Sequence, residues 1–319
     1  MSLKFSVLLP QGTTGELAVI KDPVEAYETM TRVAQTAEAA GFDSVWLADV
    51  LWPGHISGDA LSSQDFLFEC WTTTAALTRD TKRVRIGQVV TYSGLRYPAL
   101  LAKMASTVDV MSHGRLTLGI GSGSPLLATQ FRAYGYDYPD ISVRSQRLRE
   151  AVQILLTMWT QQEATFEGTY YQVHRAINQP KGVQKPHIPL LIGGGGEQVT
   201  LKLVAQYGDA CNVFGDFTTI AHKFAVLKEH CEAIGRDYQG IHRTAGTICI
   251  MEDTDEQAQA KVPDALKARY GSAALIGSPA TIRERIAAYE EAGVQELLLR
   301  FPEVERLDAI QRFAQEIMV

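Results

Sequence analysis

The chain has 319 residues, of which 46% are apolar and 21% charged, a balance that suits a globular protein with a large core. The formal net charge of −6, with no block rich in lysine or arginine, argues against a nucleic-acid-binding protein. No stretch approaches the roughly 18 apolar residues of a membrane span, and the amino terminus lacks the pattern of a secretory signal. We therefore expect a cytoplasmic protein that acts on small molecules.

The spacing of the cysteines and histidines argues against a disulfide-rich protein and against a metalloprotein. The four cysteines, Cys70, Cys211, Cys231 and Cys249, are far apart and lie in apolar segments, which predicts buried, reduced thiols. The seven histidines are scattered, and no His or Cys spacing in the sequence is typical of a metal site. We expect neither a disulfide framework nor a metal centre.

Short apolar runs alternate with helical patterns along the whole chain. The runs predict strands at 3–9, 44–48, 84–90, 116–120, 188–192, 209–213, 243–251 and 296–300. Helices are predicted at 24–40, 66–78, 98–111, 144–161, from 197, and at 220–234, 279–292 and 307–317. Such alternation favours parallel βαβ units. The strand count, without a break in composition, favours an α/β fold with one closed (β/α)8 TIM barrel over residues 1–319; a doubly wound open sheet is the alternative.

Two segments depart from this alternation. Residues 164–174 have the pattern of a β-hairpin with Phe166–Gly168 as its turn. We interpret it as an insertion at about 162–186, after the fourth βα unit. Residues 254–276 are acidic and rich in alanine, and we expect them to be irregular.

The most informative stretch begins with the apolar run Ile188–Ile192 and continues with four glycines, Gly193, Gly194, Gly195 and Gly196. Glu197 is predicted to open the next helix, with Thr200 on its first turn. A strand, a glycine loop and a helix start place bare amides at the positive end of a helix dipole, where phosphate is the natural ligand. Glycine allows close approach and a positive φ. A tight turn that binds nothing is the alternative, and four successive glycines favour phosphate binding.

In a barrel of this kind, the loops at the carboxyl ends of the strands build the active site. Candidate residues stand at several of these ends, although each has a simpler explanation: Asp49 can cap a turn, Trp52 can be a surface residue, and Arg300 can pair with Glu303. Together they predict one opening beside the glycine loop. The candidates are Asp49, Trp52, His55, Val89, Val90, Thr91, Tyr92, Gly121, Ser122, Gly123, Ser124 and Arg300.

Four blocks of the sequence resemble the luciferase-like monooxygenase superfamily. They are residues 37–49, residues 96–105 with their continuation 109–116, residues 193–212, and residues 277–294. The third block most resembles the branch that uses the deazaflavin coenzyme F420. The resemblance implies a (β/α)8 barrel with an insertion that holds a flavin or deazaflavin in its mouth, and by family analogy a homodimer.

The resemblance also implies roles for individual residues. The phosphate of the cofactor tail is expected on Gly194, Gly195 and Gly196, with Glu197, Gln198 and Thr200 nearby. A non-prolyl cis peptide is expected at Val89–Val90, behind the ring system. Further positions that match residues lining the ring or its tail are Asp49, Thr91, Gly121, Ser122 and Gly123.

Two positions depart from the family pattern, and they bear on the reaction. Val50 stands where many deazaflavin relatives have histidine, and Ser124 stands where many have glutamate or an aromatic residue. Both positions can serve proton transfer in dehydrogenase-type relatives. With Asp49 as the catalytic candidate, the first hypothesis is a coenzyme F420-dependent oxidoreductase that transfers hydride to or from a small organic substrate.

Two other functions stay open. The alternative in the same fold is an FMN-dependent monooxygenase that receives reduced flavin from a separate reductase. A third hypothesis, motivated by Val50 and Ser124, is a barrel that binds its cofactor without catalysis.

Overall fold

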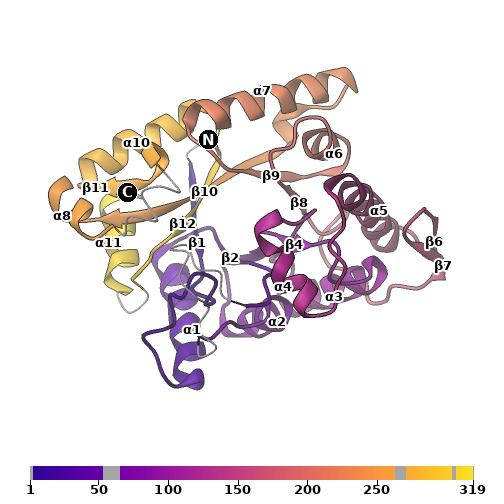
Figure 1. Cartoon of the computed structure of the whole chain (residues 1–319), viewed down its shortest axis with the longest axis horizontal. Helices are drawn as coiled ribbons and strands as arrows, with labels where there is room; N and C mark the ends of the chain where they lie inside the picture. The colour runs from indigo at the N-terminus through magenta and orange to yellow at the C-terminus, as the bar shows by residue number, and fades with distance from the viewer. Residues whose placement is uncertain (1–2, 53–64, 263–270, 304–306, 319) are drawn as a thin grey trace.

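The computed structural model describes residues 3–52, 65–262, 271–303 and 307–318, and its parallel strands close into a barrel surrounded by helices (Figure 1). Pairing of β12 with β1 closes the ring, so the prediction of a (β/α)8 barrel is confirmed and the open sheet is wrong. The barrel strands, in their order around the ring, are β1 (Lys4–Leu8), β2 (Ser44–Leu47), β3 (Arg85–Gln88), β5 (Leu116–Gly121), β8 (Leu190–Gly193), β9 (Ala210–Val213), β10 (His242–Met251) and β12 (Glu296–Arg300).

A helix follows each barrel strand and packs against the outside of the sheet. Local signals fix the helix ends: in the first helix, Asp22 Oδ1 accepts from Val24 N at 2.7 Å, Pro23 opens the first turn, and Gly41 ends the helix at a φ of 89°. The outer helices are α1 (Pro23–Ala40), α2 (Cys70–Asp80), α3 (Pro98–Met111), α5 (Ile141–Thr160), α6 (Thr200–Tyr207), α7 (Phe217–Ala233), α10 (Pro279–Glu291) and α11 (Leu307–Ile317).

Smaller elements lie in the connections. They are β4 (Thr91–Tyr92), η1 (Pro125–Leu127), α4 (Ala128–Ala133), the antiparallel pair β6 (Ala164–Glu167) and β7 (Gln172–Ala176), η2 (Tyr238–Gly240), α8 (Asp255–Ala260), η3 (Gly271–Ala273) and β11 (Leu275–Gly277). None of the described helices has the length and apolar character needed to cross a bilayer.

The barrel strands are buried on both faces, as their continuous apolar runs predict. In β12, Leu297 and Leu299 belong to the large cluster that faces the helices. Leu298 joins Trp46 and Leu191 in a smaller cluster. All four cysteines are buried and unpaired, as predicted.

Two predicted boundaries are wrong around the mouth of the barrel. The strand predicted at 84–90 ends earlier, because β3 stops at Gln88; a cis peptide bond between Val89 and Val90 follows, and β4 comes after it. The helix predicted to open at Glu197 begins at Thr200. Leu201 N instead donates to Gly196 O at 2.9 Å, which closes a wide turn before the helix starts.

The expectation that 254–276 is irregular is wrong for residues 254–262 and 271–276, while 263–270 lie outside the described residues. Thr254 and Gln257 form a capping box that starts α8. In β11, Leu275 is fully buried, and Ile276 packs with Ile248 and Ile250 in a separate small cluster. The capping box and the apolar pair were both visible in the sequence, but the acidic composition around them obscured the pattern.

The hairpin insertion is confirmed, and its turn lies further along the chain than predicted. Gly168 N donates to Tyr171 O at 2.9 Å across the turn. Glu150 of α5 determines this position, because its carboxylate accepts from the main-chain amides of Thr169, Tyr170 and Tyr171 at 2.9–3.0 Å.

A buried polar cluster joins the strands at the amino-terminal face of the barrel. Glu296 Oε2 lies 2.7 Å from His242 Nε2, and Glu296 Oε1 accepts from Ser44 Oγ at 2.5 Å and from the Ser6 hydroxyl. Burial alone would raise the pKa of Glu296, but the hydrogen bonds from His242, Ser44 and Ser6 lower this pKa to about 2. The ionised carboxylate thus links β1, β2, β10 and β12.

We predict that Glu296→Gln lowers the free energy of unfolding at pH 7 by about 3 kcal/mol, because it removes the charge that these donors stabilise. The folded pKa lies below the ordinary value of 4.5, so this contribution is present above pH 4.5 and is lost as the pH falls toward 2. Urea unfolding between pH 2 and 7 measures it. The exposed Glu284→Gln is the matched control, and equal acid sensitivity of the two variants would contradict the assignment.

Candidate functional site

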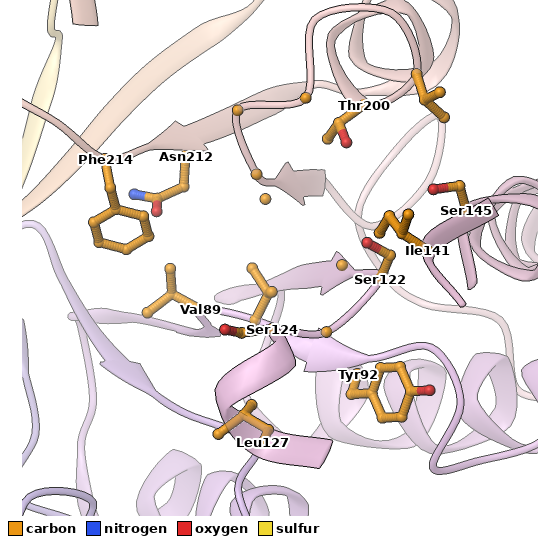
Figure 2. Close-up of a pocket in the computed structure, with 18 of the residues that line it drawn as sticks. Val89, Tyr92, Ser122, Ser124, Leu127, Ile141, Ser145, Thr200, Asn212 and Phe214 are labelled. Carbon is orange, nitrogen blue, oxygen red and sulfur yellow. The ribbon is translucent and has the colours of Figure 1, made fainter. Parts of the chain in front are cut away.

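A cavity of about 800 Å³ opens at the carboxyl ends of the barrel strands. Its walls come from the ends of β2, β5, β8 and β9, the segment that joins β3 to β4, and residues of α5, α6 and α7 (Figure 2). In the close-up, Thr200 and Ser145 lie toward one end, while Asn212, Phe214 and Val89 lie toward the other. The cavity therefore extends across the mouth of the barrel.

The floor of the cavity depends on the side chain of Val90, which lies between two neighbouring strands. A Cβ atom on Gly121 of β5 would lie 2.7 Å from Val90 Cγ2, and one on Gly193 of β8 would lie 2.6 Å from Val90 Cγ1. Only glycine leaves room for the valine on both sides. The expected cis peptide bond between Val89 and Val90 is present in this segment. The side chains of the two valines give the cavity an apolar base.

The glycine loop after β8 presents main-chain amides to the cavity. Gly194 has a φ of 127° and donates its N–H to Asn212 O at 3.0 Å. Among the residues that the structure describes, the amides from Gly195 to Thr200 have no acceptor within the protein. They stand at the amino-terminal end of α6, where the helix dipole favours an anion.

A cation of α7 lies beside this loop. A Cβ atom on Gly195 would be 3.6 Å from Lys223 Cε, and Lys223 Nζ lies 2.5 Å from Glu197 Oε1. His222 Nε2 lies 3.0 Å from the same carboxylate oxygen. The hydrogen bonds from Lys223 and His222 hold the pKa of Glu197 below its usual range. The loop thus combines free amides with a lysine that a carboxylate already positions.

Asp49 reaches the cavity wall as part of a buried ion pair. Its Oδ2 lies 2.6 Å from Arg96 Nη1 and its Oδ1 lies 3.2 Å from Arg96 Nη2, while Tyr92 N donates to Oδ2 at 3.3 Å. Arg96 also pairs with Glu69. Burial raises the pKa of Asp49, and Arg96 opposes that shift. Because both carboxylate oxygens are engaged, the geometry favours a positioning role over the predicted catalytic one.

The loop after β5 is held by a single arginine. Arg144 Nη1 donates to Ser122 O at 2.7 Å, to Gly123 O at 2.8 Å and to the Tyr138 hydroxyl at 2.8 Å. Behind the loop, the Tyr92 ring stacks on Phe131 with centroids 4.7 Å apart, and burial raises the pKa of Tyr92 to about 12. The Tyr92 hydroxyl therefore stays protonated at neutral pH, and the loop carrying Ser122 and Ser124 has a rigid support.

Asn212 and Phe214 line the cavity at the end of β9. Asn212 Nδ2 donates to Thr244 Oγ1 at 2.8 Å, while Asn212 Oδ1 is buried without a donor among the described residues. The Phe214 ring rests against Gly246 of β10, where an added Cβ atom would lie 2.9 Å from the ring. Phe214 is nevertheless 60% exposed.

Most of the predicted site residues line this cavity. They are Asp49, Val89, Val90, Tyr92, Gly121, Ser122, Gly123, Ser124, Gly193, Gly194, Gly195, Gly196, Glu197, Gln198 and Thr200. Val50, which departs from the family pattern, also lines the cavity.

Three predicted residues are directed elsewhere, and a fourth, His55, lies outside the described residues. Thr91 is fully buried and accepts from Trp71 Nε1 at 3.0 Å, so its hydroxyl points toward α2. Trp52 packs near Tyr134, with ring centroids 6.2 Å apart. The guanidinium of Arg300 binds the connection after β1, with Nη1 3.1 Å from Thr13 Oγ1 and 3.4 Å from Glu16 Oε1.

Other lining residues were not identified from the sequence. Asn212 and Phe214 occupy alternate positions at the end of β9, so the rule that strand ends build the mouth was sufficient to find them. Lys223, Ser145 and Ile141 come from outer helices. Nothing in the sequence near these three residues distinguishes them from ordinary surface positions.

Comparison with known proteins identifies relatives of the chain. The chain is 34% identical over 230 residues to an F420-dependent glucose-6-phosphate dehydrogenase of Kineococcus radiotolerans. The alignment covers 70% of this chain and 64% of the relative. A protein of the same name from Beutenbergia cavernae is 27% identical over 316 residues, covering 88% and 90%. The alignment with the first relative thus spans less than two thirds of that protein's length.

Solved structures share the fold. An F420-dependent secondary alcohol dehydrogenase in complex with an F420–acetone adduct superposes with a TM-score of 0.79 at 22% identity, over 100% of this chain and 99% of the other. A monooxygenase from Streptomyces bottropensis gives a TM-score of 0.80 at 20% identity, with 99% of each chain covered. The family model for luciferase-like monooxygenase matches residues 3–272. The chain belongs to the luciferase-like monooxygenase family.

Proposed function

We propose that this protein is an oxidoreductase that uses the deazaflavin coenzyme F420 to transfer hydride to or from a small organic substrate. The glycine loop carries the proposal, because its free amides and Lys223 match a phosphate-bearing cofactor tail. The names of the curated relatives support the choice of F420. A cytoplasmic location and a homodimer remain predictions.

The residues present fit such a cofactor. Gly195, Gly196 and Thr200 would hold its phosphate, and the segment around Val90 would support its ring system. When bound, the deazaflavin supplies a carbon that accepts or donates hydride. The protein's own part is to orient the two reactants and to exclude water. The Asp49–Arg96 pair fixes the β2 end of the wall, and Arg144 fixes the loop after β5.

We predict that purified apo-protein binds F420 more tightly than FMN, as measured by fluorescence titration with each cofactor. We also predict that the complex with reduced F420 does not consume oxygen, because carbon replaces the reactive ring nitrogen of a flavin. Binding of FMN without any binding of F420, together with oxygen consumption on reduced FMN, would instead identify a two-component monooxygenase. Binding of F420 without turnover of any substrate would favour a non-catalytic barrel.

Gly195→Asp is predicted to weaken F420 binding at least about tenfold, because it places a carboxylate against the phosphate. Titration of the variant with F420 measures the change. Gly240→Asp is the matched control, since a Cβ atom at Gly240 meets nothing within 4 Å and Gly240 lies away from the cavity lining. Unchanged affinity in Gly195→Asp would show that the glycine loop is only a turn.

Lys223→Met is predicted to lower F420 affinity about tenfold and to reduce its dependence on salt, because a charge-assisted contact to phosphate is lost. Glu197→Gln should have the opposite effect on affinity, since Glu197 neutralises this lysine. Lys228→Met on the same helix is the control. The Lys228 side chain is 60% exposed, and its Nζ lies 3.8 Å from Glu232 Oε1 in a weak surface ion pair. Equal affinities of the Lys223 and Lys228 variants would exclude Lys223 from the phosphate site.

A further inference from the structure

A second cavity, of about 310 Å³, opens at the amino-terminal face of the barrel, opposite the mouth. Its wall includes the first residues of several strands, among them Lys4 of β1 and Arg85 of β3. An apolar layer lies between this amino-terminal cavity and the mouth cavity: Trp46 and Leu191 of the layer line the former, and Val90, packed against them, lines the latter. The volume suits a small ligand.

The charges of two carboxylates in the amino-terminal cavity are already stabilised within the protein. Lys4 Nζ lies 3.8 Å from Asp43 Oδ1 at the rim. Glu296 accepts from Ser44 Oγ at 2.5 Å, and its other oxygen lies 2.7 Å from His242 Nε2. These groups therefore need no ligand to offset their charge.

Arg85 brings a positive charge to the cavity and has neutral partners. Its Nη2 donates to Leu116 O at 3.3 Å, to Thr117 Oγ1 at 3.1 Å and to Gln184 Oε1 at 3.2 Å. These three contacts hold the guanidinium in one orientation. Its Nε and Nη1 have no acceptor among the residues that the structure describes. They are donors that can form charge-assisted hydrogen bonds to an anionic ligand group.

Asp209 brings a negative charge from another part of the same wall. It directly precedes β9, which stands three places from β3 in the ring. Its Oδ2 accepts from Leu190 N at 2.8 Å. His187 Nδ1 is 3.7 Å from that oxygen but lies closer to Ile188 O, at 2.9 Å. Asp209 and Arg85 thus give the cavity a negative and a positive side.

We infer that the amino-terminal cavity binds a free α-amino acid with a small apolar side chain. The ligand carboxylate meets Arg85, the ammonium group meets Asp209, and the side chain rests against Ile86 and Leu191 of the wall. A zwitterion matches both charges at once, whereas a simple anion leaves Asp209 unmatched and a simple cation leaves Arg85 unmatched. The site is separate from the mouth cavity and independent of the cofactor proposed there.

The test is calorimetric titration of the apo-protein with L-valine and with two analogues that each lack one charge. Isovalerate lacks the ammonium group, and isobutylamine lacks the carboxylate. We expect a Kd for L-valine below about 1 mM and at least about tenfold weaker binding of each analogue. Absence of L-valine binding would overturn the inference. Isovalerate or isobutylamine binding as tightly as L-valine would also overturn it, because the site would then take a simple ion.

Two variants locate the ligand within the protein. Arg85→Met should weaken L-valine binding at least about tenfold, and Asp209→Asn, which keeps an acceptor for Leu190 N, at least about fivefold. Arg83→Met is the matched control, because Arg83 is exposed and lies outside the lining of this cavity. Unchanged affinity in Asp209→Asn would overturn the inference, so the test holds even if Arg85→Met fails to fold.

A further variant distinguishes the two cavities. Gly195→Asp alters the mouth cavity and should leave the Kd for L-valine within about twofold. Loss of L-valine binding in this variant would place the amino acid in the mouth cavity and overturn the inference. Failure of F420 to bind the wild-type protein would overturn the proposed function and leave the expected titration with L-valine the same.

Discussion

The insertion of the Val90 side chain between Gly121 and Gly193 is the contact on which the site depends. It locks the ends of β3, β5 and β8 into one arrangement, because both glycines would clash with the valine if they carried a Cβ atom. The base of the cavity and the start of the glycine loop are then fixed together. The site consequently combines a rigid floor with connections that differ in length and content.

Much of the fold could be predicted from the sequence, because the alternation of buried strands and helices leaves few ways to cover every apolar face. The glycine loop at the cavity was equally predictable, since Gly193–Gly196 follow a strand and precede a helix. Prediction failed where side-chain direction decided the outcome. Thr91 is the first residue of β4, and its hydroxyl accepts from Trp71 Nε1 instead of facing the cavity. Successive side chains of a strand face opposite ways, so a strand boundary misplaced by one or two residues assigns a side chain to the wrong face.

The missing members of the site have a similar explanation. Lys223 comes from α7 and reaches the glycine loop only because β8 and β9 are neighbours and their helices pack together. Arg300 shows the reverse case, since it stands at a strand end as expected but is drawn to Glu16 and Thr13 in the connection after β1. Strand ends can be located from a pattern, whereas the partner of a long charged side chain is decided by tertiary contacts.

The cluster around Glu296 separates the groups that hold the strands together from the groups that form the cavity at the mouth. Its polar links among β1, β2, β10 and β12 lie at the face opposite the mouth, so cohesion of the ring does not depend on the residues that line the mouth cavity. Connections at the mouth can therefore be lengthened, shortened or exchanged in evolution without breaking the polar contacts that join the barrel strands. One scaffold can in this way acquire new specificities through its loops while its amino-terminal end keeps the same hydrogen bonds.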